Sequence, residues 1–219
     1  MQSADTPTAG SLAREGLWTN NPAMVQLLGL CPLLAVSGTF VTAFALGLTT
    51  LFVITLSNIL ISLLRHQLTP TVRLPMQILV IASFVTLADL LLQTFAFGLH
   101  QRIGLFVALI VTNCTLLGRA ELFASRHPVS SAVIDGVMMG LGFLAVLVTM
   151  GFIRELLGHG TLFSGADLLL GPSVDLTIRF ADGGLLLFLL PPGAFMVLGC
   201  LIALKNVISQ SWTADEKAS

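Results

Sequence analysis

Long apolar segments dominate the chain, and they constrain its fold more than any other feature. A helix that crosses a bilayer needs about 20 apolar residues, because the hydrocarbon core is roughly 30 Å thick. Only 10% of the 219 residues are charged, against about 25% in soluble domains. Period-two alternation, the mark of a membrane β-barrel, is absent. The sequence therefore predicts an all-α integral membrane protein with six transmembrane helices, in apolar segments at residues 23–37, 40–64, 74–97, 103–117, 132–153 and 185–204.

The six segments form one predicted membrane domain, residues 21–207, between polar tails at 1–20 and 208–219. They divide as three plus three. An odd number of crossings in each half turns the second half upside down relative to the first. We therefore expect two inverted three-helix repeats, at about 21–98 and 102–207.

Lysine and arginine are unevenly distributed between the two sides of this topology, and cytoplasmic loops of membrane proteins carry the excess. If both termini lie on one side, that side holds seven of the ten basic residues. No cleavable signal peptide is recognisable in the first 20 residues. We therefore expect both termini in the cytoplasm. The seven are Arg14, Arg65, Arg73, Arg119, Arg126, Lys205 and Lys217, and the other three are Arg102, Arg154 and Arg179.

The first and fourth segments are too short to cross as plain helices, and each carries a cysteine at its interruption. In the first, Pro32 follows Cys31, and proline breaks an arriving helix because it lacks an amide hydrogen and clashes with the preceding turn. We expect a helix arriving from Val25 to break near Cys31 and a new one to begin at Pro32. In the fourth, Thr112 and Asn113 precede Cys114, and both are good helix-cap residues. Helices 1 and 4 are thus predicted to be interrupted at Cys31 and Cys114.

The two cysteines leave two interpretations open. Most membrane cysteines are small packing residues. Interrupted helices in matching halves, however, mark functional sites near the bilayer midplane, and an inverted pair would bring Cys31 and Cys114 together there. Free amides at helix starts favour thiolate anions, and iron–sulfur clusters are held by thiolates, usually four. Two cysteines could supply half of such a site and a partner subunit the rest, whereas Cys200 is interpreted as a packing residue.

Two acidic residues lie inside apolar segments. Asp89 is near the middle of the third segment, where a charged carboxylate costs about 2.5–3.5 kcal/mol on insertion scales. Such a residue marks an ion or proton path, or else it is protonated or hydrogen-bonded at a helix contact. Asp135 lies near the start of the fifth segment, where the helix dipole stabilises an acid without any further function. Both are candidate residues of an ion path.

Several chemistries are missing from the sequence. The four histidines fall in loops or at segment ends, which argues against a haem held by paired histidines within the membrane. A net charge of −1 with no basic run argues against nucleic-acid binding. No Walker loop, dinucleotide fingerprint or HExxH zinc motif occurs. The residues alone therefore support a six-helix membrane protein with a paired-cysteine site, and no catalytic residue is assigned.

Six longer motifs are specific enough to compare with known families: Gly16–Pro22, Val25–Val36, Ile110–Cys114, Gly118–Ala124, Gly160–Asp167 and Leu190–Phe195. Together they resemble the RnfE/NqrD family of membrane subunits, and the resemblance extends over nearly the whole chain. The run that starts at Cys31 and the run Leu190–Phe195 are more similar to the RnfE branch than to the NqrD branch.

The resemblance implies a place for the chain in an Rnf complex, which couples electron transfer to the translocation of Na⁺ or H⁺. In that family the protein pairs with a homologous, oppositely oriented subunit, RnfA, and each contributes two cysteines to a [2Fe–2S] cluster within the membrane. The matching residues here are Cys31 and Cys114. Membrane acids of the family match Asp89 and Asp135 as candidates for the ion path.

Further expectations follow from the same resemblance. Electrons pass between ferredoxin or NAD carriers on the cytoplasmic side and flavins on the other side, and neither flavin nor haem is expected on this chain. The chain would act only within an enzyme complex in the bacterial inner membrane, with RnfA, RnfB, RnfC, RnfD and RnfG as partners. The competing interpretations are an inverted-repeat secondary transporter or channel with structural cysteines, and a purely structural membrane anchor.

Overall fold

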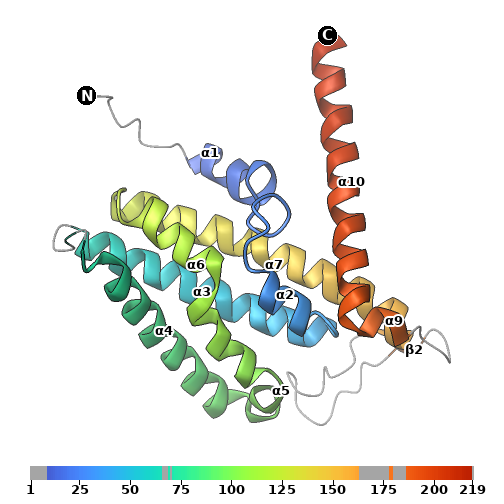
Figure 1. Cartoon of the computed structure of the whole chain (residues 1–219), viewed down its shortest axis with the longest axis horizontal. Helices are drawn as coiled ribbons and strands as arrows, with labels where there is room; N and C mark the ends of the chain where they lie inside the picture. The colour runs from blue at the N-terminus through green and yellow to red at the C-terminus, as the bar shows by residue number, and fades with distance from the viewer. Residues whose placement is uncertain (1–8, 66–68, 70, 163–177, 180–185, 219) are drawn as a thin grey trace.

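The computed structural model describes residues 9–65, 69, 71–162, 178–179 and 186–218, and these are almost entirely helical (Figure 1). Two short strands pair antiparallel, with Thr161 opposite Arg179. The elements are α1 (Ala9–Arg14), η1 (Glu15–Thr19), α2 (Leu30–Val36), α3 (Phe40–Leu64), α4 (Arg73–Phe95), α5 (Phe97–Ala108), η2 (Leu109–Thr112), α6 (Cys114–Arg119), η3 (Ala120–Ala124), α7 (Val129–His159), β1 (Thr161–Leu162), β2 (Ile178–Arg179), α9 (Leu186–Leu189) and α10 (Pro191–Ala218).

Within the described residues, five helices are long and apolar enough to cross a membrane, judged by length and composition. They correspond to the second to sixth expected segments and are Phe40–Leu64, Arg73–Phe95, Phe97–Ala124, Val129–His159 and Pro191–Gln210. The third of them is composite, because α5 continues through the 3-10 turn η2 into α6 and the π-helical turn η3. The structure thus has the helical, multi-pass architecture that the sequence predicts.

The first expected segment, residues 23–37, does not form a helix of membrane length, and only the seven residues of α2 are helical there. The expectation that a helix arrives from Val25 is wrong, because the residues before Cys31 form turns. The side-chain oxygen of Asn21 accepts hydrogen bonds from two nearby backbone amides, at 3.1 and 3.2 Å, and so curls the chain. Its amide nitrogen donates to Gly142 O at 3.2 Å, which fastens the turn to α7.

The two expected tails are helical where the structure describes them. Residues 9–19 form α1 and η1, which pack against α7, and Leu12 is only 2% exposed. Residues 1–8 lie outside the described part of the chain. At the other end, α10 continues through the expected tail to Ala218.

The most extensive contact joins α3 and α7, which lie side by side across the molecule (Figure 1). Glycines on α7 allow the close approach. A Cβ added at Gly136 would lie 3.1 Å from Thr55 Cα, and one added at Gly140 would lie 3.1 Å from Leu51 Cα. Helices in lipid associate through such close packing of small residues, because lipid tails are as apolar as the helices themselves.

The core lies between α3, α4, α5 and α7, and a second apolar cluster joins α2 and α10 to α7. Only 22% of the membrane-length window is buried in α4, and the same share in α10, so both helices keep wide apolar faces for lipid or other subunits. Fully buried side chains of the core include Val53, Ile54, Ile61, Ile81, Ile103, Val107 and Met139.

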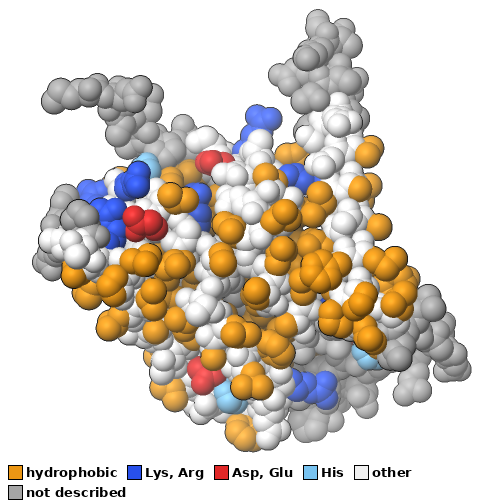
Figure 2. All heavy atoms as spheres, in the orientation of Figure 1, with side chains coloured by type: hydrophobic (Ala, Val, Ile, Leu, Met, Phe, Trp, Pro, Cys, Tyr) orange, Lys and Arg blue, Asp and Glu red, His pale blue; other side chains and the backbone are white. Residues whose placement is uncertain are grey.

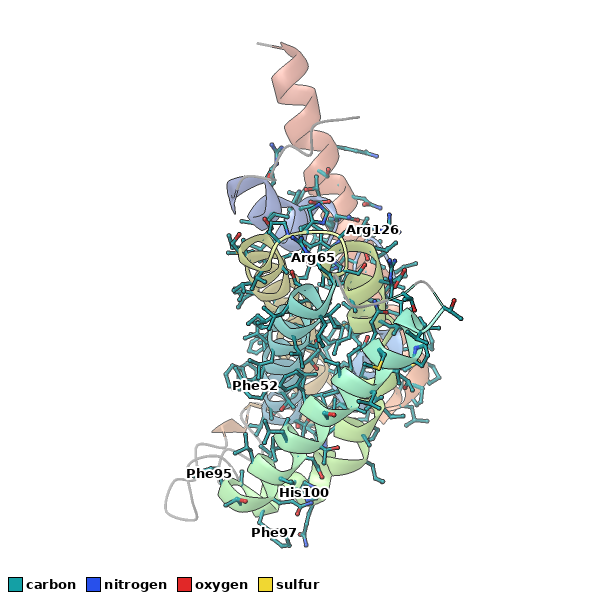
Figure 3. All side chains as sticks on the ribbon, turned by 90° about the vertical axis from the view of Figure 1, so that its left-hand side faces the viewer. Phe52, Arg65, Phe95, Phe97, His100 and Arg126 are labelled. Carbon is teal, nitrogen blue, oxygen red and sulfur yellow. The ribbon has the colours of Figure 1, made fainter. Side chains whose placement is uncertain are left out.

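Charged side chains gather at two levels of the molecule. Figure 2 shows them toward the top and the bottom of the view, with hydrophobic side chains filling the zone between. In Figure 3, Arg65 and Arg126 lie toward the upper end, whereas His100 lies near the lower end. The end of α10 and helix α1 share the upper level (Figure 1). This layered distribution is typical of proteins that span a bilayer.

Candidate functional site

The two cysteine-bearing segments meet at Gly29. This glycine has φ 74°, a left-handed conformation that residues with a Cβ avoid. A Cβ added there would lie 2.9 Å from Thr115 Oγ1 and 3.0 Å from Asn113 Oδ1. The turn two residues before Cys31 is therefore pressed against the side chains that flank Cys114 in the chain. The structure thus brings together the segments that carry the two expected ligands.

Asn113 shapes the second of these segments. It has an extended backbone between η2 and α6, and its side-chain oxygen accepts a hydrogen bond from Thr115 N at 2.9 Å. This is a helix cap of the kind expected before Cys114, which is the first residue of α6. In the other segment, α2 begins at Leu30, two residues earlier than the proline predicts, so that Cys31 is its second residue.

Two polar atoms beside Cys114 are buried without a partner. Asn113 Nδ2 and Thr115 Oγ1 have no hydrogen-bond partner among the residues that the structure describes. The two residues are only 3% and 1% exposed. A buried group without its hydrogen bond costs about 1–3 kcal/mol, so each such donor in a native protein needs an explanation. Cluster and thiolate sulfurs accept hydrogen bonds, and these donors fit a site of that kind.

Cys31, Cys114 and Cys200 are free thiols, and all three are exposed on the surface of the chain. In the described part of the chain, no three His, Cys, Asp or Glu side chains are grouped so as to hold a metal ion. Two thiols can supply at most half of a four-thiolate site. Cys200, expected as a packing residue, lines an apolar groove with Ile153 and Leu157 of α7.

Asp135 is paired with Arg119. Arg119 Nε donates to Asp135 Oδ2 at 2.9 Å, and Arg119 Nη2 contacts the other carboxylate oxygen. Asp135 is 1% exposed, and the guanidinium also lies 4.9 Å from the centre of the Phe123 ring. From the sequence, the helix dipole alone accounts for Asp135. The structure adds a specific buried cation, Arg119, which lies 16 residues earlier in the chain. The sequence feature that could have indicated this partner is an arginine within three residues of the end of an apolar segment.

Two buried side-chain amides at the same end of the molecule, those of Asn58 and Gln77, are not predicted from the sequence. Asn58 on α3 is fully buried beside Gly136, and neither of its side-chain polar atoms has a partner among the described residues. Gln77 on α4 donates to Glu121 Oε2 at 2.9 Å, and Arg73 donates to the other carboxylate oxygen at 3.1 Å. Their only signal in the sequence is a polar residue within an apolar run.

Asp89 lies far from Asp135. Along α4, roughly 24 Å separate Asp89 from Arg73, the first residue of the helix, at about 1.5 Å per residue. Asp89 instead contacts His100 of α5, whose Nε2 lies 2.9 Å from Asp89 Oδ1, and it accepts a hydrogen bond from Gln93 at 3.2 Å. The structure therefore does not bring the two candidate acids into one site.

The far end of α7 holds the segment that follows Cys31. Arg154 is 2% exposed and donates to Ser37 Oγ at 2.8 Å, as well as to backbone carbonyls of α2 and α9. The neighbouring Glu155 accepts a hydrogen bond from Phe40 N at 2.7 Å, at the start of α3. These two residues act as structural ties between helices.

Comparison with known proteins bears on this arrangement. Residues 10–202 match the family described as "Rnf-Nqr subunit, membrane protein". A relative from Shewanella baltica (strain OS185) is 54% identical over 202 residues, which cover 91% of this chain and 87% of the relative. A relative from Vibrio parahaemolyticus serotype O3:K6 is 52% identical over 208 residues, 94% of this chain and 90% of the relative. Both relatives are named as the E subunit of the ion-translocating oxidoreductase complex. The chain therefore belongs to the Rnf-Nqr family of membrane subunits.

Proposed function

We propose that this chain is a membrane subunit of an Rnf-type complex that couples electron transfer to the translocation of Na⁺ or H⁺. The names of its relatives support this assignment. The observation that carries it is the contact of Gly29 with Asn113 and Thr115, because this contact joins the segments of both cysteines. No activity is proposed for the chain outside the complex.

Cys31 and Cys114 are proposed to hold one side of a [2Fe–2S] cluster, and a homologous, oppositely oriented protein of the RnfA type supplies two further thiolates. When bound, the cluster supplies one-electron transfer. The exposure of both thiols supports a site that another subunit completes. Asn113 and Thr115 contribute unpaired donors beside Cys114, which are suited to hydrogen-bond the cluster sulfurs.

The remaining parts of the proposal concern the complex. Electrons pass between ferredoxin or NAD carriers on the cytoplasmic side and flavins on the other side, with RnfB, RnfC, RnfD and RnfG as further partners. The distribution of lysine and arginine supports an inner-membrane topology with both termini in the cytoplasm. Two inverted repeats remain part of the proposal, and the 3-10 turn before Cys114 supports an interrupted first helix in the second of them.

Asp89 and Asp135 are proposed to belong to two separate ion-binding sites on the ion path. Their positions near opposite ends of the helices support two sites rather than one. Asp135 has its charge balanced by a buried arginine, whereas the side chain of Asp89 is 31% exposed. Asp89 is therefore the acid that a cation can reach from outside the chain.

The test is iron analysis and electron paramagnetic resonance of the complete complex, purified from the wild type and from single cysteine variants. Cys31→Ser and Cys114→Ser should each remove the reducible [2Fe–2S] signal of this subunit pair. Cys200→Ser is the matched control and should keep it. Full iron content in both of the first two variants would overturn the cluster assignment and favour a transporter in which the cysteines are structural.

A further inference from the structure

The α4–α5 hairpin places polar side chains of two helices against each other. Ala96 is the only residue between α4 and α5. Its amide donates to Leu92 O at 2.9 Å, and its carbonyl accepts from His100 N at 2.9 Å, so hydrogen bonding continues on both sides of the link. The end of α4 and the start of α5 are therefore held within one turn of each other.

Asp89, Gln93 and His100 form a closed set of contacts at this place. His100 Nε2 lies 2.9 Å from Asp89 Oδ1, and Gln93 Nε2 donates to Asp89 Oδ2 at 3.2 Å. Gln93 Nε2 and His100 Nε2 are 3.3 Å apart. Both carboxylate oxygens are thus engaged. The side chains of His100 and Asp89 remain 21% and 31% exposed, which leaves the pair accessible.

Among the residues that the structure describes, few other charges surround this pair. Helix α3, which packs against both α4 and α5, contains no Asp, Glu, Lys, Arg or His. Near the pair, Arg102 is exposed and lies two residues beyond His100. Within the described part of the chain, His100 is therefore the titratable group in direct contact with the Asp89 carboxylate. The other charged side chains on elements packed against α4 or α5 are Arg73, Arg119 and Glu121, at the opposite end of α4.

Gly104 makes room for the imidazole. It lies one turn after His100 on α5, and a Cβ added there would lie 2.8 Å from His100 Nε2 and 3.1 Å from its Cε1. The ring therefore occupies a place over the helix that a side chain at residue 104 would fill. A Gly104→Ala change would push the imidazole away from Asp89 without removing it from the protein.

We propose that His100 is a positioning residue for Asp89, which orients the carboxylate together with Gln93 and controls how much negative charge it presents to a cation. This inference rests on the proposed role of Asp89 in the ion path. Histidine is the side chain that changes charge between about pH 5 and 8. A protonated imidazole beside Asp89 would neutralise the carboxylate and oppose entry of a cation. A neutral imidazole would only donate a hydrogen bond, and the carboxylate charge would then attract the cation.

The test uses the complete complex in proteoliposomes, with a voltage-sensitive dye that reports the charge moved per electron, whichever cation moves. In the wild type, this ratio should rise with increasing pH. His100→Gln keeps a hydrogen-bond donor but has no titratable group, so its pH profile should be flat. His100→Leu also removes the donor, so its ratio should lie severalfold below that of His100→Gln at every pH. Gly104→Ala should flatten the profile in the same direction as His100→Gln.

Two matched controls accompany these variants. His159→Gln changes an exposed histidine at the end of α7, and Gly199→Ala adds a Cβ with nothing within 4 Å. Both should keep the wild-type profile. The cluster signal and iron content of each variant report whether the complex is assembled, and their loss in His100→Gln would overturn the positioning role in favour of a structural one.

The remaining outcomes separate this inference from the proposed function. If Asp89→Asn moves as much charge per electron as the wild type, the proposed role of Asp89 in the ion path is overturned, and this inference is overturned with it. If Asp89→Asn is impaired while the His100 and Gly104 variants behave as the controls do, only the positioning role of His100 is overturned. A wild-type pH profile in His100→Gln would likewise overturn only the positioning role of His100.

Discussion

Arg154 on α7 donates a hydrogen bond of 2.8 Å to Ser37 Oγ, which joins two residues 117 positions apart in the chain. The same guanidinium donates to Leu34 O at 3.2 Å, Phe188 O at 3.0 Å and Leu189 O at 2.8 Å. One buried side chain thus ties the end of α2 and the end of α9 to α7. The helix that carries Cys31 depends on this tie for its position.

The first prediction concerns the loss of this tie. Arg154→Met keeps most of the apolar volume but leaves buried carbonyls without a donor, and each unsatisfied group costs about 1–3 kcal/mol. We therefore expect a loss of stability of about 3 kcal/mol, seen as a lower thermal midpoint of the purified complex in detergent. Arg14→Met, at an exposed position of α1, is the control. Equal midpoints for the two variants would contradict this account of Arg154.

The second prediction concerns the turn at Gly29. Alanine there would hold a left-handed conformation at a cost of about 1–2 kcal/mol, and its Cβ would displace the Thr115 and Asn113 side chains. Gly29→Ala should therefore lower the [2Fe–2S] signal and iron content of the complex. Gly38→Ala adds a Cβ in open space and should keep both. A full cluster signal in Gly29→Ala would show that the contact between the two cysteine segments is dispensable.

The third prediction concerns the Thr115 hydroxyl, which has no hydrogen-bond partner among the described residues. Hydrogen bonds to cluster sulfurs stabilise the reduced form, which is the more negative one, and so raise the reduction potential. Thr115→Val should lower the potential measured by redox titration with paramagnetic resonance, whereas Thr115→Ser should restore it. Thr112→Val is the control, because the Thr112 hydroxyl is exposed and donates to Leu109 O. An unchanged potential in Thr115→Val would assign the hydroxyl to packing.

The fourth prediction separates the structural role of Asp135 from a role in ion movement. Removing one member of a buried ion pair leaves an unpaired charge and costs about 3–5 kcal/mol, whereas replacing both costs much less. Asp135→Asn should therefore destabilise the complex more than the double variant Arg119→Leu/Asp135→Leu, in thermal unfolding. If the stable double variant still moves ions at the wild-type rate, Asp135 does not belong to the ion path.

Sequence reasoning succeeds here where the signal is local. Apolar length alone predicts α3, α4, α7 and most of α10, because a membrane helix is defined by its own composition. The cap at Asn113 follows from the residue type beside Cys114. The partner of Asp89, His100, is only 11 residues away, but it is not identified from the sequence, which assigns the histidines only to loops or segment ends.

The failures are long-range. Apolar composition suggests a first membrane helix over residues 23–37, but the turn at Asn21 is fastened to Gly142, 121 residues later, and no local pattern reveals that bond. The same holds for the bond between Arg154 and Ser37. Gly29 is recognisable as a glycine, yet its contact with Thr115 depends on how two distant segments meet.

The single-residue link at Ala96 bears on how the chain enters the bilayer during synthesis. Because Gln93 and His100 both lie within the same hairpin as Asp89, the carboxylate finds its hydrogen-bond partners before any later helix has been made. A helical hairpin that satisfies its own polar groups can leave the insertion machinery as one unit, at a lower cost than an isolated helix with an unpaired acid. Residues 73–108 can then complete their most polar membrane contact as soon as they have been translated.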